Sequence, residues 1–239
     1  GAVELLEGVR PSLRAAGSAS VVLVSSNSTT TQPGWPVELA EACLAGARTV
    51  VHPLPFPDPP LSDGAVTPRP WRATDLPWRF ESFSDPQCLR FSWPLTEPCT
   101  PEHVHRRFTD EEVARRAGTE LALAVGSAAD PEELLGSISL YDIERENARA
   151  SIGYWLAARA RGQGAATRAV RLLGRWAFAY LDLSRLELTC APDNLPSQRV
   201  AERCGFLREG ILRSHMAFQG GRRDTVVYGV VPGDLSASS

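Results

Sequence analysis

A short run of residues in this sequence combines the types that hold phosphate groups in proteins. Residues 161–166 read Arg-Gly-Gln-Gly-Ala-Ala, after an extended apolar run at 151–156 and before a segment whose apolar residues recur every three or four positions. That order predicts a strand, a glycine-rich turn and the N-terminus of an amphipathic helix. Backbone N–H groups converge at such a place and can bind a phosphate or pyrophosphate. We therefore predict that the chain binds a phosphorylated cofactor.

Three kinds of glycine-rich turn are compared for this segment. A Walker loop needs a lysine after its last glycine, and the chain contains no lysine, so that class is excluded. A dinucleotide fingerprint needs a third glycine three residues after Gly164, where Thr167 stands, and no βαβ repeat follows. An ordinary strand-to-helix turn, in which glycine only relieves backbone strain, stays open on these residues alone.

The elements that must position this turn form a mixed pattern of strands and helices. Antiparallel hairpins alternate with helices, which favours an α+β fold over a doubly wound parallel sheet. Pro101 after Thr100 is a typical helix start, and Gly205 is a typical helix end. We expect strands at 67–72, 121–125, 135–141, 150–156, 186–190, 206–212 and 225–231, and helices at 76–84, 101–117, 166–181 and 196–204.

The composition limits the class of protein. The chain has 239 residues, 43% of them apolar and 22% charged, which is typical of a globular protein with a sizeable core. Its net charge of −3 argues against nucleic acid as a partner, and no apolar run approaches the ~20 residues that a membrane span needs. The five cysteines show no C-x-x-C spacing, so we expect reduced thiols, no metal site and a cytoplasmic location.

The glycine-rich turn and several motifs around it resemble those of one enzyme family. Arg161-x-x-Gly164-x-Ala166 fits Gln/Arg-x-x-Gly-x-Gly/Ala, the acetyl-CoA pyrophosphate loop of the GNAT acetyltransferases. Asn194-x-x-Ser197, a Gly-Phe pair before a strand and the string Gly-Tyr-Trp-Leu at 153–156 resemble the Rim-type branch, which acetylates N-termini of ribosomal proteins. The resemblance covers residues 66–234. It implies a GNAT-type mixed, mostly antiparallel central sheet flanked by helices.

The same resemblance implies acetyl-CoA as co-substrate. Backbone amides from Gly162 to Thr167 would bind the pyrophosphate at the positive end of the helix. The strands that carry Trp155 and Cys190 would splay apart after a bulge and admit the thioester. The implied cofactor-binding residues are Trp155, Leu156, Arg161, Gly162, Gln163, Gly164, Ala165, Ala166, Thr167 and Asn194.

The resemblance further implies direct attack of the amine on the thioester in a ternary complex. A backbone N–H near Trp155 or Leu156 would stabilise the oxyanion. Ser197 is the candidate acid for the leaving thiolate, although a serine in a first helical turn also satisfies backbone N–H groups. Glu187 is the candidate base, because Ser151 stands where many relatives have glutamate; alternatively Glu187 pairs with an arginine. A neutral α-amine, with a pKa of about 8, can also arrive from bulk solvent.

The N-terminal part does not fit this family. We expect residues 1–50 to form a short αβα appendage, with helices at 2–15 and 37–47, a strand at 21–24 and a Ser/Thr/Gly-rich turn after it. Residues 51–65 are expected to be a proline-rich linker before the acetyltransferase domain at 66–234. The strand ending near Ser26 resembles a short-chain dehydrogenase fragment, but without lysine we expect no reductase activity. A fusion remnant, a packing appendage and an oligomerisation element all stay open.

The predicted function is N-acetylation of a primary amine, and a protein or peptide N-terminus is the expected acceptor. A small-molecule amine is the alternative acceptor and would require an acidic cleft. A non-catalytic acyl-CoA-binding module is the alternative from another class, because Ser151 replaces the glutamate. We expect no nucleic-acid or membrane partner, and a homodimer is compatible with the sequence.

Overall fold

The computed structural model describes residues 19–25, 28–35, 52–130 and 132–235. The chain divides into two compact units, residues 1–51 and 52–239. The described part of the first unit is a hairpin of β1 (Ala19–Ser25) and β2 (Ser28–Trp35). The prediction of a turn after the first strand was wrong, because this threonine-rich segment is β2; β-branched residues favour strands. The helices predicted at 2–15 and 37–47 lie outside the described residues.

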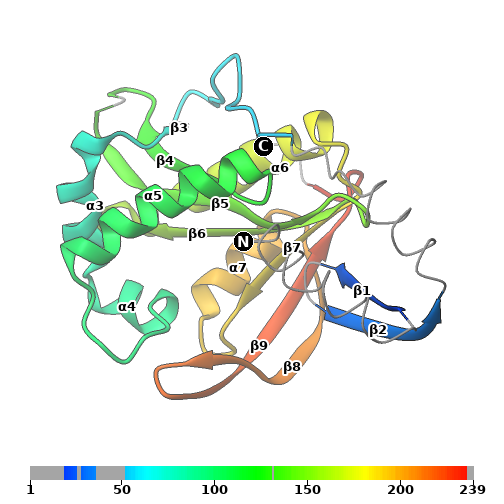
Figure 1. The fold of residues 1–239 in the computed structure, drawn as a ribbon. Helices are drawn as coiled ribbons and strands as arrows, with labels where there is room; N and C mark the ends of the chain where they lie inside the picture. The colour runs from blue at the N-terminus through cyan, green and yellow to red at the C-terminus, as the bar shows by residue number, and fades with distance from the viewer. Residues whose placement is uncertain (1–18, 26–27, 36–51, 131, 236–239) are drawn as a thin grey trace. The chain divides into compact units, whose positions relative to one another are not determined.

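The second unit contains one mixed sheet of seven strands, in the order β3-β4-β5-β6-β7-β9-β8 (Figure 1). Only the β6–β7 pair is parallel. The predicted α+β fold with a mostly antiparallel sheet is therefore confirmed. The strands are β3 Val66–Pro70, β4 Leu121–Ser127, β5 Leu134–Glu144, β6 Arg149–Leu156, β7 Arg185–Cys190, β8 Leu207–Phe218 and β9 Gly221–Val230.

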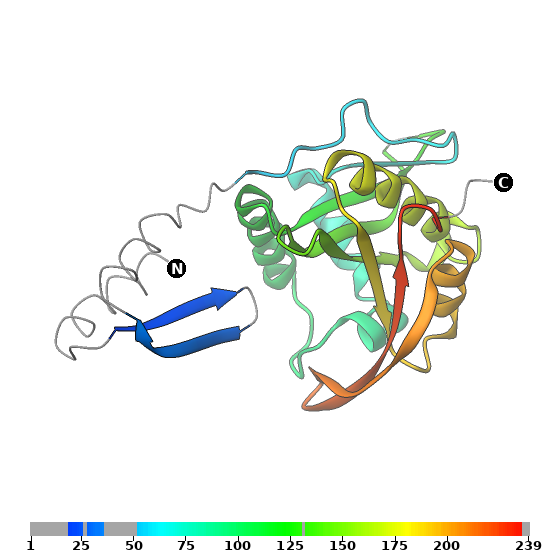
Figure 2. The same ribbon diagram turned by 90° about the vertical axis from the view of Figure 1, so that its right-hand side faces the viewer.

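Helices connect these strands and cover the sheet (Figure 2). The α-helices are α3 Leu76–Phe83, α4 Pro86–Ser92, α5 Pro101–Ala117, α6 Ala165–Tyr180 and α7 Leu195–Arg203. Two short 3-10 helices, η1 Ala73–Asp75 and η2 Ala158–Ala160, precede α3 and the glycine-rich turn. Helix α4 was not predicted. None of the helices in the described ranges is long and apolar enough to cross a membrane.

Strand alternation assigns the helices to opposite faces of the sheet. Successive side chains of a strand point to opposite faces. On β4, Leu123 packs in the main core with Leu173 of α6. Its neighbour Ala124 packs in a smaller cluster with Trp78 of α3 and Phe108 of α5. Helix α6 therefore covers one face, and α3 with α5 covers the other.

The proline-rich segment before β3 is tied to the second unit. Residues 52–65 form neither helix nor strand, as five prolines between 52 and 60 dictate. Leu54 is nevertheless fully buried in the main core. Its backbone N–H donates to Arg115 O at 2.9 Å, and Arg115 Nη1 donates to Leu54 O at 2.6 Å. Residues 52–65 therefore pack on the domain that they precede.

The parallel pair β6–β7 opens along its length. The two strands pair only at Arg149–Arg185, Ala150–Leu186 and Ser151–Glu187. Beyond Ser151, β6 continues to Leu156 and β7 continues to Cys190, but the two strands no longer pair with each other. The opening lies near α4, which contacts β6, and near α7, which contacts β7. The sheet itself therefore contains a gap that leads from one face to the other.

Candidate functional site

Two cavities meet at the gap between β6 and β7. One, the loop cavity, has a volume of about 420 Å³ and lies between the glycine-rich turn, the start of α6, α4 and α7. The other, the aromatic cavity, has a volume of about 610 Å³ and lies between α3, α4, α5 and the open ends of β6 and β7. The residues that line both cavities are Phe91, Ser92, Tyr154, Trp155, Asn194 and Ser197.

The aromatic cavity lies on the face of the sheet that α3 and α5 cover. On β5, Ser137 and Tyr141 line this cavity. Ile138 and Leu140, which lie between them in the sequence, are buried in the main core with α6. Tyr154 and Trp155 of β6 line both cavities, so the gap between β6 and β7 joins this cavity to the loop cavity at the start of α6.

Backbone groups dominate the glycine-rich side of the loop cavity. Gly162 and Gly164 have φ of 76° and 82°, the left-handed conformation that glycine adopts without strain. Gly164 is the N-cap of α6, and no side chain caps this helix. The first intrahelical bond is donated by Arg168 N to Gly164 O. The preceding N–H groups have no intrahelical acceptor, so the helix dipole and free donors both favour an anion here.

Cationic side chains from α7 line the same cavity. Arg199 and Arg203 belong to the cavity wall, and no carboxylate within the described residues lies within 4 Å of either guanidinium. Neither arginine was predicted as a site residue. The i, i+4 spacing after Asn194-x-x-Ser197 could have indicated them, because it places two arginines on one side of the helix that starts there.

The Arg161 side chain binds the protein rather than the cavity space. Its Nε and Nη2 donate to Leu156 O at 3.2 and 3.0 Å, and Nη2 also donates to Asp85 Oδ1 at 2.5 Å. Nη1 donates to Gln87 Oε1 at 3.1 Å. The guanidinium lowers the pKa of the Asp85 carboxyl, which in turn caps α4 by accepting from backbone N–H groups. Arg161 therefore fastens α4 to the end of β6.

Gln163 differs from the other residues predicted for the glycine-rich turn. Its Nε2 donates to Arg159 O at 2.7 Å, and the residue does not line the loop cavity. The remaining predicted positions of the turn do line it, namely Arg161, Gly162, Gly164, Ala165, Ala166 and Thr167. Trp155, Leu156 and Asn194 also belong to this wall. The structure thus brings together every predicted cofactor-binding residue except Gln163.

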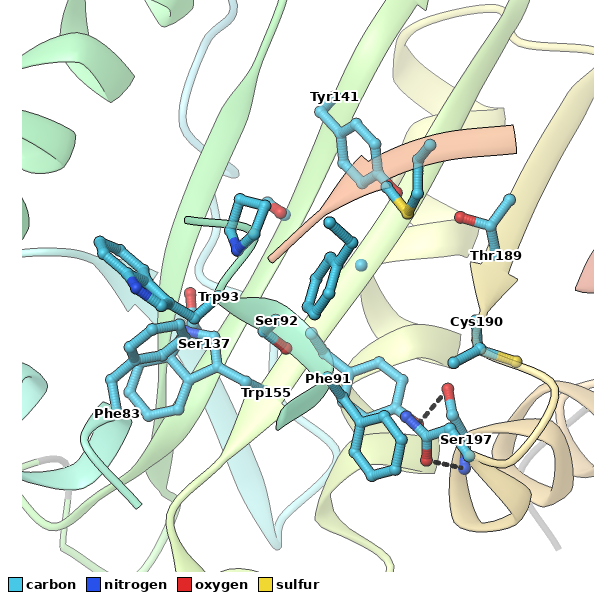
Figure 3. A pocket seen from close by; sticks show the side chains of 18 of the residues that line it. Phe83, Phe91, Ser92, Trp93, Ser137, Tyr141, Trp155, Thr189, Cys190 and Ser197 are labelled. Carbon is cyan, nitrogen blue, oxygen red and sulfur yellow. Dashed lines mark hydrogen bonds between the residues drawn. The ribbon is translucent and has the colours of Figure 1, made fainter. Parts of the chain in front are cut away.

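Ser197 lies where the two cavities join. Asn194 is the N-cap of α7, and its Oδ1 accepts from Ser197 N at 3.3 Å. The Ser197 hydroxyl is therefore not needed to cap its own helix. Tyr154 Oη lies 3.3 Å from Ser197 Oγ and donates to it. Figure 3 shows Cys190 and Ser197 side by side at the end of β7 and the start of α7.

Burial keeps the acidic groups around Ser197 protonated. Desolvation raises the pKa of Tyr154 to about 12 and that of Cys190 to about 11. Both groups are consequently neutral at physiological pH. Tyr154 can then act only as a hydrogen-bond donor or acceptor through an intact hydroxyl, and Cys190 is a thiol rather than a thiolate nucleophile.

The backbone of β6 presents polar groups to the gap. Ala157 N donates to Leu135 O at 2.9 Å, so the N–H of Ala157 faces β5. Because an antiparallel ladder alternates, the N–H and C=O of Leu156 face away from β5. The C=O does so, since it accepts from Arg161 and from Cys88 Sγ at 3.6 Å. The Leu156 N–H therefore points into the opening between β6 and β7.

Aromatic rings form one wall of the aromatic cavity. Phe83, Trp93 and Trp155 line it, and Figure 3 shows them grouped opposite Cys190 and Ser197. Trp155 packs against Phe83 with ring centroids 5.4 Å apart. Trp71 and Trp78 pack behind Trp155, at 6.4 and 6.0 Å, and do not line the cavity. Trp93 and Trp155 are thus the tryptophans of this cavity wall.

The acidic side chain of this cavity is neutralised. Glu111 is buried, and Arg79 binds its two oxygens at 2.9 and 2.6 Å. Arg107 Nε lies 3.0 Å from the same carboxylate and also pairs with Glu120. No other aspartate or glutamate lines the cavity. The described wall therefore offers no free carboxylate.

Glu187 is not part of either cavity wall. Its Oε1 lies 2.9 Å from Arg185 Nε and 3.4 Å from Arg149 Nη1, at the closed end of the β6–β7 pair. Ser151 pairs with Glu187 in the strand register. The predicted base thus lies in an ion-pair cluster at the opposite end of β7 from Ser197, which matches the alternative that it pairs with arginine.

The comparisons with known proteins agree with this arrangement. Residues 66–207 match the family described as "Acetyltransferase (GNAT) domain". The Bacillus subtilis protein "Probable N-acetyltransferase YjcK" is 35% identical over 136 residues, 56% of this chain and 75% of that protein. The Escherichia coli "Ribosomal-protein-serine acetyltransferase" is 40% identical over 82 residues, 34% of this chain and 46% of that protein.

A solved structure extends the likeness to the fold. "Mycobacterium smegmatis RimJ in complex with CoA-disulfide" has a TM-score of 0.65 and 25% identity, covering 75% of this chain and 88% of that one. This chain spans 75% of the length of YjcK but only 54% of that of another Bacillus subtilis relative, "Putative ribosomal N-acetyltransferase YdaF". It spans less than half of the E. coli relative. On the family match and the shared fold, this chain belongs to the GNAT acetyltransferases.

Proposed function

We propose that this protein transfers the acetyl group of acetyl-CoA to a primary amine, by direct attack in a ternary complex. The observation that carries the proposal is the junction of two cavities at Tyr154 and Ser197. A reaction between two bound molecules needs two sites that open onto one place. The loop cavity has the chemistry for a phosphorylated co-substrate, and the aromatic cavity is left for the acceptor.

The loop cavity fits the phosphates of acetyl-CoA. Free N–H groups at the start of α6 and the arginines Arg199 and Arg203 are suited to a pyrophosphate. Beyond Ser151, β6 does not pair with β7, which leaves an open strand edge beside the gap for the amide groups of pantetheine. The solved relative RimJ of Mycobacterium smegmatis supports the assignment, since its structure is a complex with CoA-disulfide.

The chemical step follows from the groups at the junction. The neutral amine attacks the thioester carbonyl carbon, a C–N bond forms, and the C–S bond breaks. The Leu156 N–H is the donor proposed for the developing oxyanion. Ser197 supplies a proton to the leaving sulfur, while Tyr154 donates a hydrogen bond to Ser197 Oγ. The attacking nitrogen releases its proton to solvent, and solvent returns a proton to Ser197 Oγ, which balances the reaction.

A strong general base is not part of this proposal. The acid that lines the aromatic cavity, Glu111, is held by two arginines, and Glu187 is held by Arg149 and Arg185. An α-amine with a pKa of about 8 is partly neutral in bulk solvent and needs no such base. We therefore propose that the acceptor enters as the free amine, as expected for a peptide N-terminus.

The acceptor cavity favours a peptide over a polycation. A polyamine or aminoglycoside acceptor calls for free carboxylates, and the described wall has none. Aromatic and apolar side chains such as Phe83, Trp93 and Phe218 instead suit an N-terminal residue and its neighbours. The E. coli relative, named a ribosomal-protein-serine acetyltransferase, supports a protein acceptor.

One assay tests the proposed function. The protein is incubated with acetyl-CoA and a panel of N-terminal peptides and small amines, and free thiol release is measured. Turnover of peptides is the expected result. Binding of acetyl-CoA without turnover of any acceptor would favour the non-catalytic acyl-CoA-binding module. Failure to bind acetyl-CoA in calorimetry would remove the assignment of the loop cavity.

A further inference from the structure

We propose that the acceptor carries a carboxylate close to its reactive amine, and that Arg223 binds this carboxylate in the aromatic cavity. This inference rests on the proposed function and adds the substrate class. Arg223 lies on β9, and no sequence motif pointed to it. The hydrogen bonds and charges of the aromatic cavity identify this residue.

The Arg223 guanidinium lacks a strong partner. Its two Nη atoms donate to Phe91 O at 3.4 and 3.3 Å, which is long for a charged donor. Its Nε is buried and has no hydrogen-bond acceptor. The guanidinium carbon lies 3.6 Å from the centre of the Phe218 ring. No carboxylate of the described residues lies within 4 Å of it.

The charge balance of the cavity wall isolates this cation. Arg79 and Arg107 share Glu111, and Arg107 also pairs with Glu120, so these four charges cancel. Burial lowers the pKa of Arg223 and the charge of Asp193 raises it, but the Asp193 carboxylate already binds Arg90 at 2.6 Å. Among the described residues, Arg223 is therefore the wall arginine that has no carboxylate partner of its own.

Desolvation makes this unpaired charge unfavourable. Burial lowers the pKa of Arg223, so the protonated form is destabilised by its surroundings. A carboxylate that reaches the guanidinium would replace the weak carbonyl contacts with charge-assisted bonds. The orphaned Nε and an adjacent Nη present the paired donors that a planar carboxylate accepts.

The position of Arg223 connects it to the reacting end of the cavity. Cys190 interacts with both groups, since its thiol bonds Ser197 and is influenced by the charge of Arg223. All three residues line the aromatic cavity. In the strand register Val226 of β9 pairs with Cys190 of β7, and Arg223 stands three residues along β9 from Val226, about 10 Å at the usual strand rise. The long Arg223 side chain and one or two residues of an acceptor can span this distance. In a peptide acceptor this range corresponds to an Asp or Glu at the start of the chain.

A second source of the same chemistry is a free α-carboxylate. An amino acid or a dipeptide also carries a carboxylate near its amine. The experiment separates the two sources with matched acceptors. Ser-Asp and Ser-Glu peptides with amidated C-termini are compared with their Ser-Asn and Ser-Gln counterparts. Free serine and Ser-Ala are compared with their C-terminal amides.

In the set that matches the true acceptor, the wild-type protein is expected to show a kcat/KM about 10-fold higher for the acid than for its amide. One charge-assisted interaction with Arg223 accounts for a difference of this size. Preference within the peptide pairs assigns Arg223 to an acidic side chain, and preference within the short pairs assigns it to a terminal carboxylate. Equal use of acid and amide in both sets would overturn the inference while leaving the proposed function intact.

Variants link the preference to Arg223. Arg223→Gln should bring the acid-to-amide ratio to about 1, and Arg223→Lys should retain part of it, because a lysine keeps the charge but not the paired donors. Arg222→Gln is the matched control, since Arg222 is exposed and binds Ser214 O outside the cavity. A ratio unchanged in Arg223→Gln would also overturn the inference.

Folding and co-substrate binding are measured on the same variants. The thermal midpoint and the affinity for acetyl-CoA should match those of the wild type, because Arg223 does not line the loop cavity. If Arg223→Gln unfolds, the wild-type acceptor ratios and Arg223→Lys still decide the question. If no acceptor is turned over by the wild type, the proposed function fails instead.

Discussion

The two cavities are built from the chain in different ways. The loop cavity takes most of its wall from one continuous stretch, 154–167, together with α7. The aromatic cavity combines side chains from α3, α4, α5, β5, β6, β7 and the β8–β9 hairpin. The first relies on backbone N–H groups and the second on particular side chains. A local pattern can therefore specify the co-substrate site, whereas the acceptor site depends on how distant segments pack.

The two cavities also differ in electrostatics. The loop cavity has a helix N-terminus and two unpaired arginines, an arrangement that suits several phosphates. In the aromatic cavity most charges cancel, and Arg223 is the exception. This difference predicts that co-substrate binding depends strongly on charge, and that acceptor choice depends on a single cation and on shape.

The largest expected effect is on the loop cavity. We expect Gly164→Asp to weaken acetyl-CoA binding by about 100-fold or more, because it adds a negative charge at the proposed pyrophosphate site. Gly164→Asn is the matched control, since Asn has nearly the same shape and both residues tolerate positive φ. Isothermal calorimetry measures both affinities. Equal affinity of the two variants would place the phosphates elsewhere.

The next effect concerns the junction of the cavities. We expect Ser197→Ala to lower kcat by about 10- to 100-fold, because the leaving thiolate loses its proton donor. Affinity for acetyl-CoA should not change, since the Asn194 cap binds the backbone of residue 197. Tyr154→Phe should lower kcat less. Steady-state kinetics with calorimetry separates the two quantities; an unchanged kcat in Ser197→Ala would assign the protonation to another group.

A smaller effect is expected from the arginines of α7. The double change Arg199→Gln and Arg203→Gln should weaken acetyl-CoA binding by about 10-fold and flatten its salt dependence, since exposed charges are screened by salt. Arg213→Gln on the exposed strand β8 serves as the charge-matched control. Affinities are measured at low and high salt. A salt dependence identical to that of the wild type would separate these arginines from the phosphates.

The smallest effect is expected at the closed end of the β6–β7 pair. Glu187→Gln should leave kcat/KM within about 2-fold, because the carboxylate is held by two arginines and lines neither cavity. The pH profile of kcat/KM should then follow the acceptor amine in both proteins. A loss of 10-fold or more, with a shifted profile, would restore Glu187 as the base.

Much of the fold was predictable because its elements are locally encoded. The helix predicted at 101–117 has those bounds, with Thr100 and Pro101 at its start and Gly118 in the left-handed conformation at its end. The apolar stripe of α6 predicted a helix that is buried on one side, and Leu173 and Ala177 are fully buried. Such patterns depend on neighbours within a turn, so a sequence can be read for them directly.

The sequence alone was less informative where several segments meet. Asp85 and Pro86 are start signals for α4, but the helix is only seven residues long and has no apolar periodicity to support them. Strand β8 extends past its predicted end and β9 begins before its predicted start, because the two strands pair again from Met216–Arg223 to Phe218–Gly221 after a register shift. Pairing partners lie in other parts of the chain, and a local pattern does not contain them.

The sequence by itself determined the glycine-rich wall of the loop cavity, which is the proposed co-substrate site. The turn from Arg161 to Thr167 is contiguous, its glycines adopt positive φ, and its proposed function rests on backbone atoms that every residue carries. Only the tertiary structure decided the acceptor side. It turned Glu187 into an ion-pair residue, brought Tyr154 to Ser197, and left Arg223 unpaired. The physical reason is that charge pairing and burial depend on contacts across the chain.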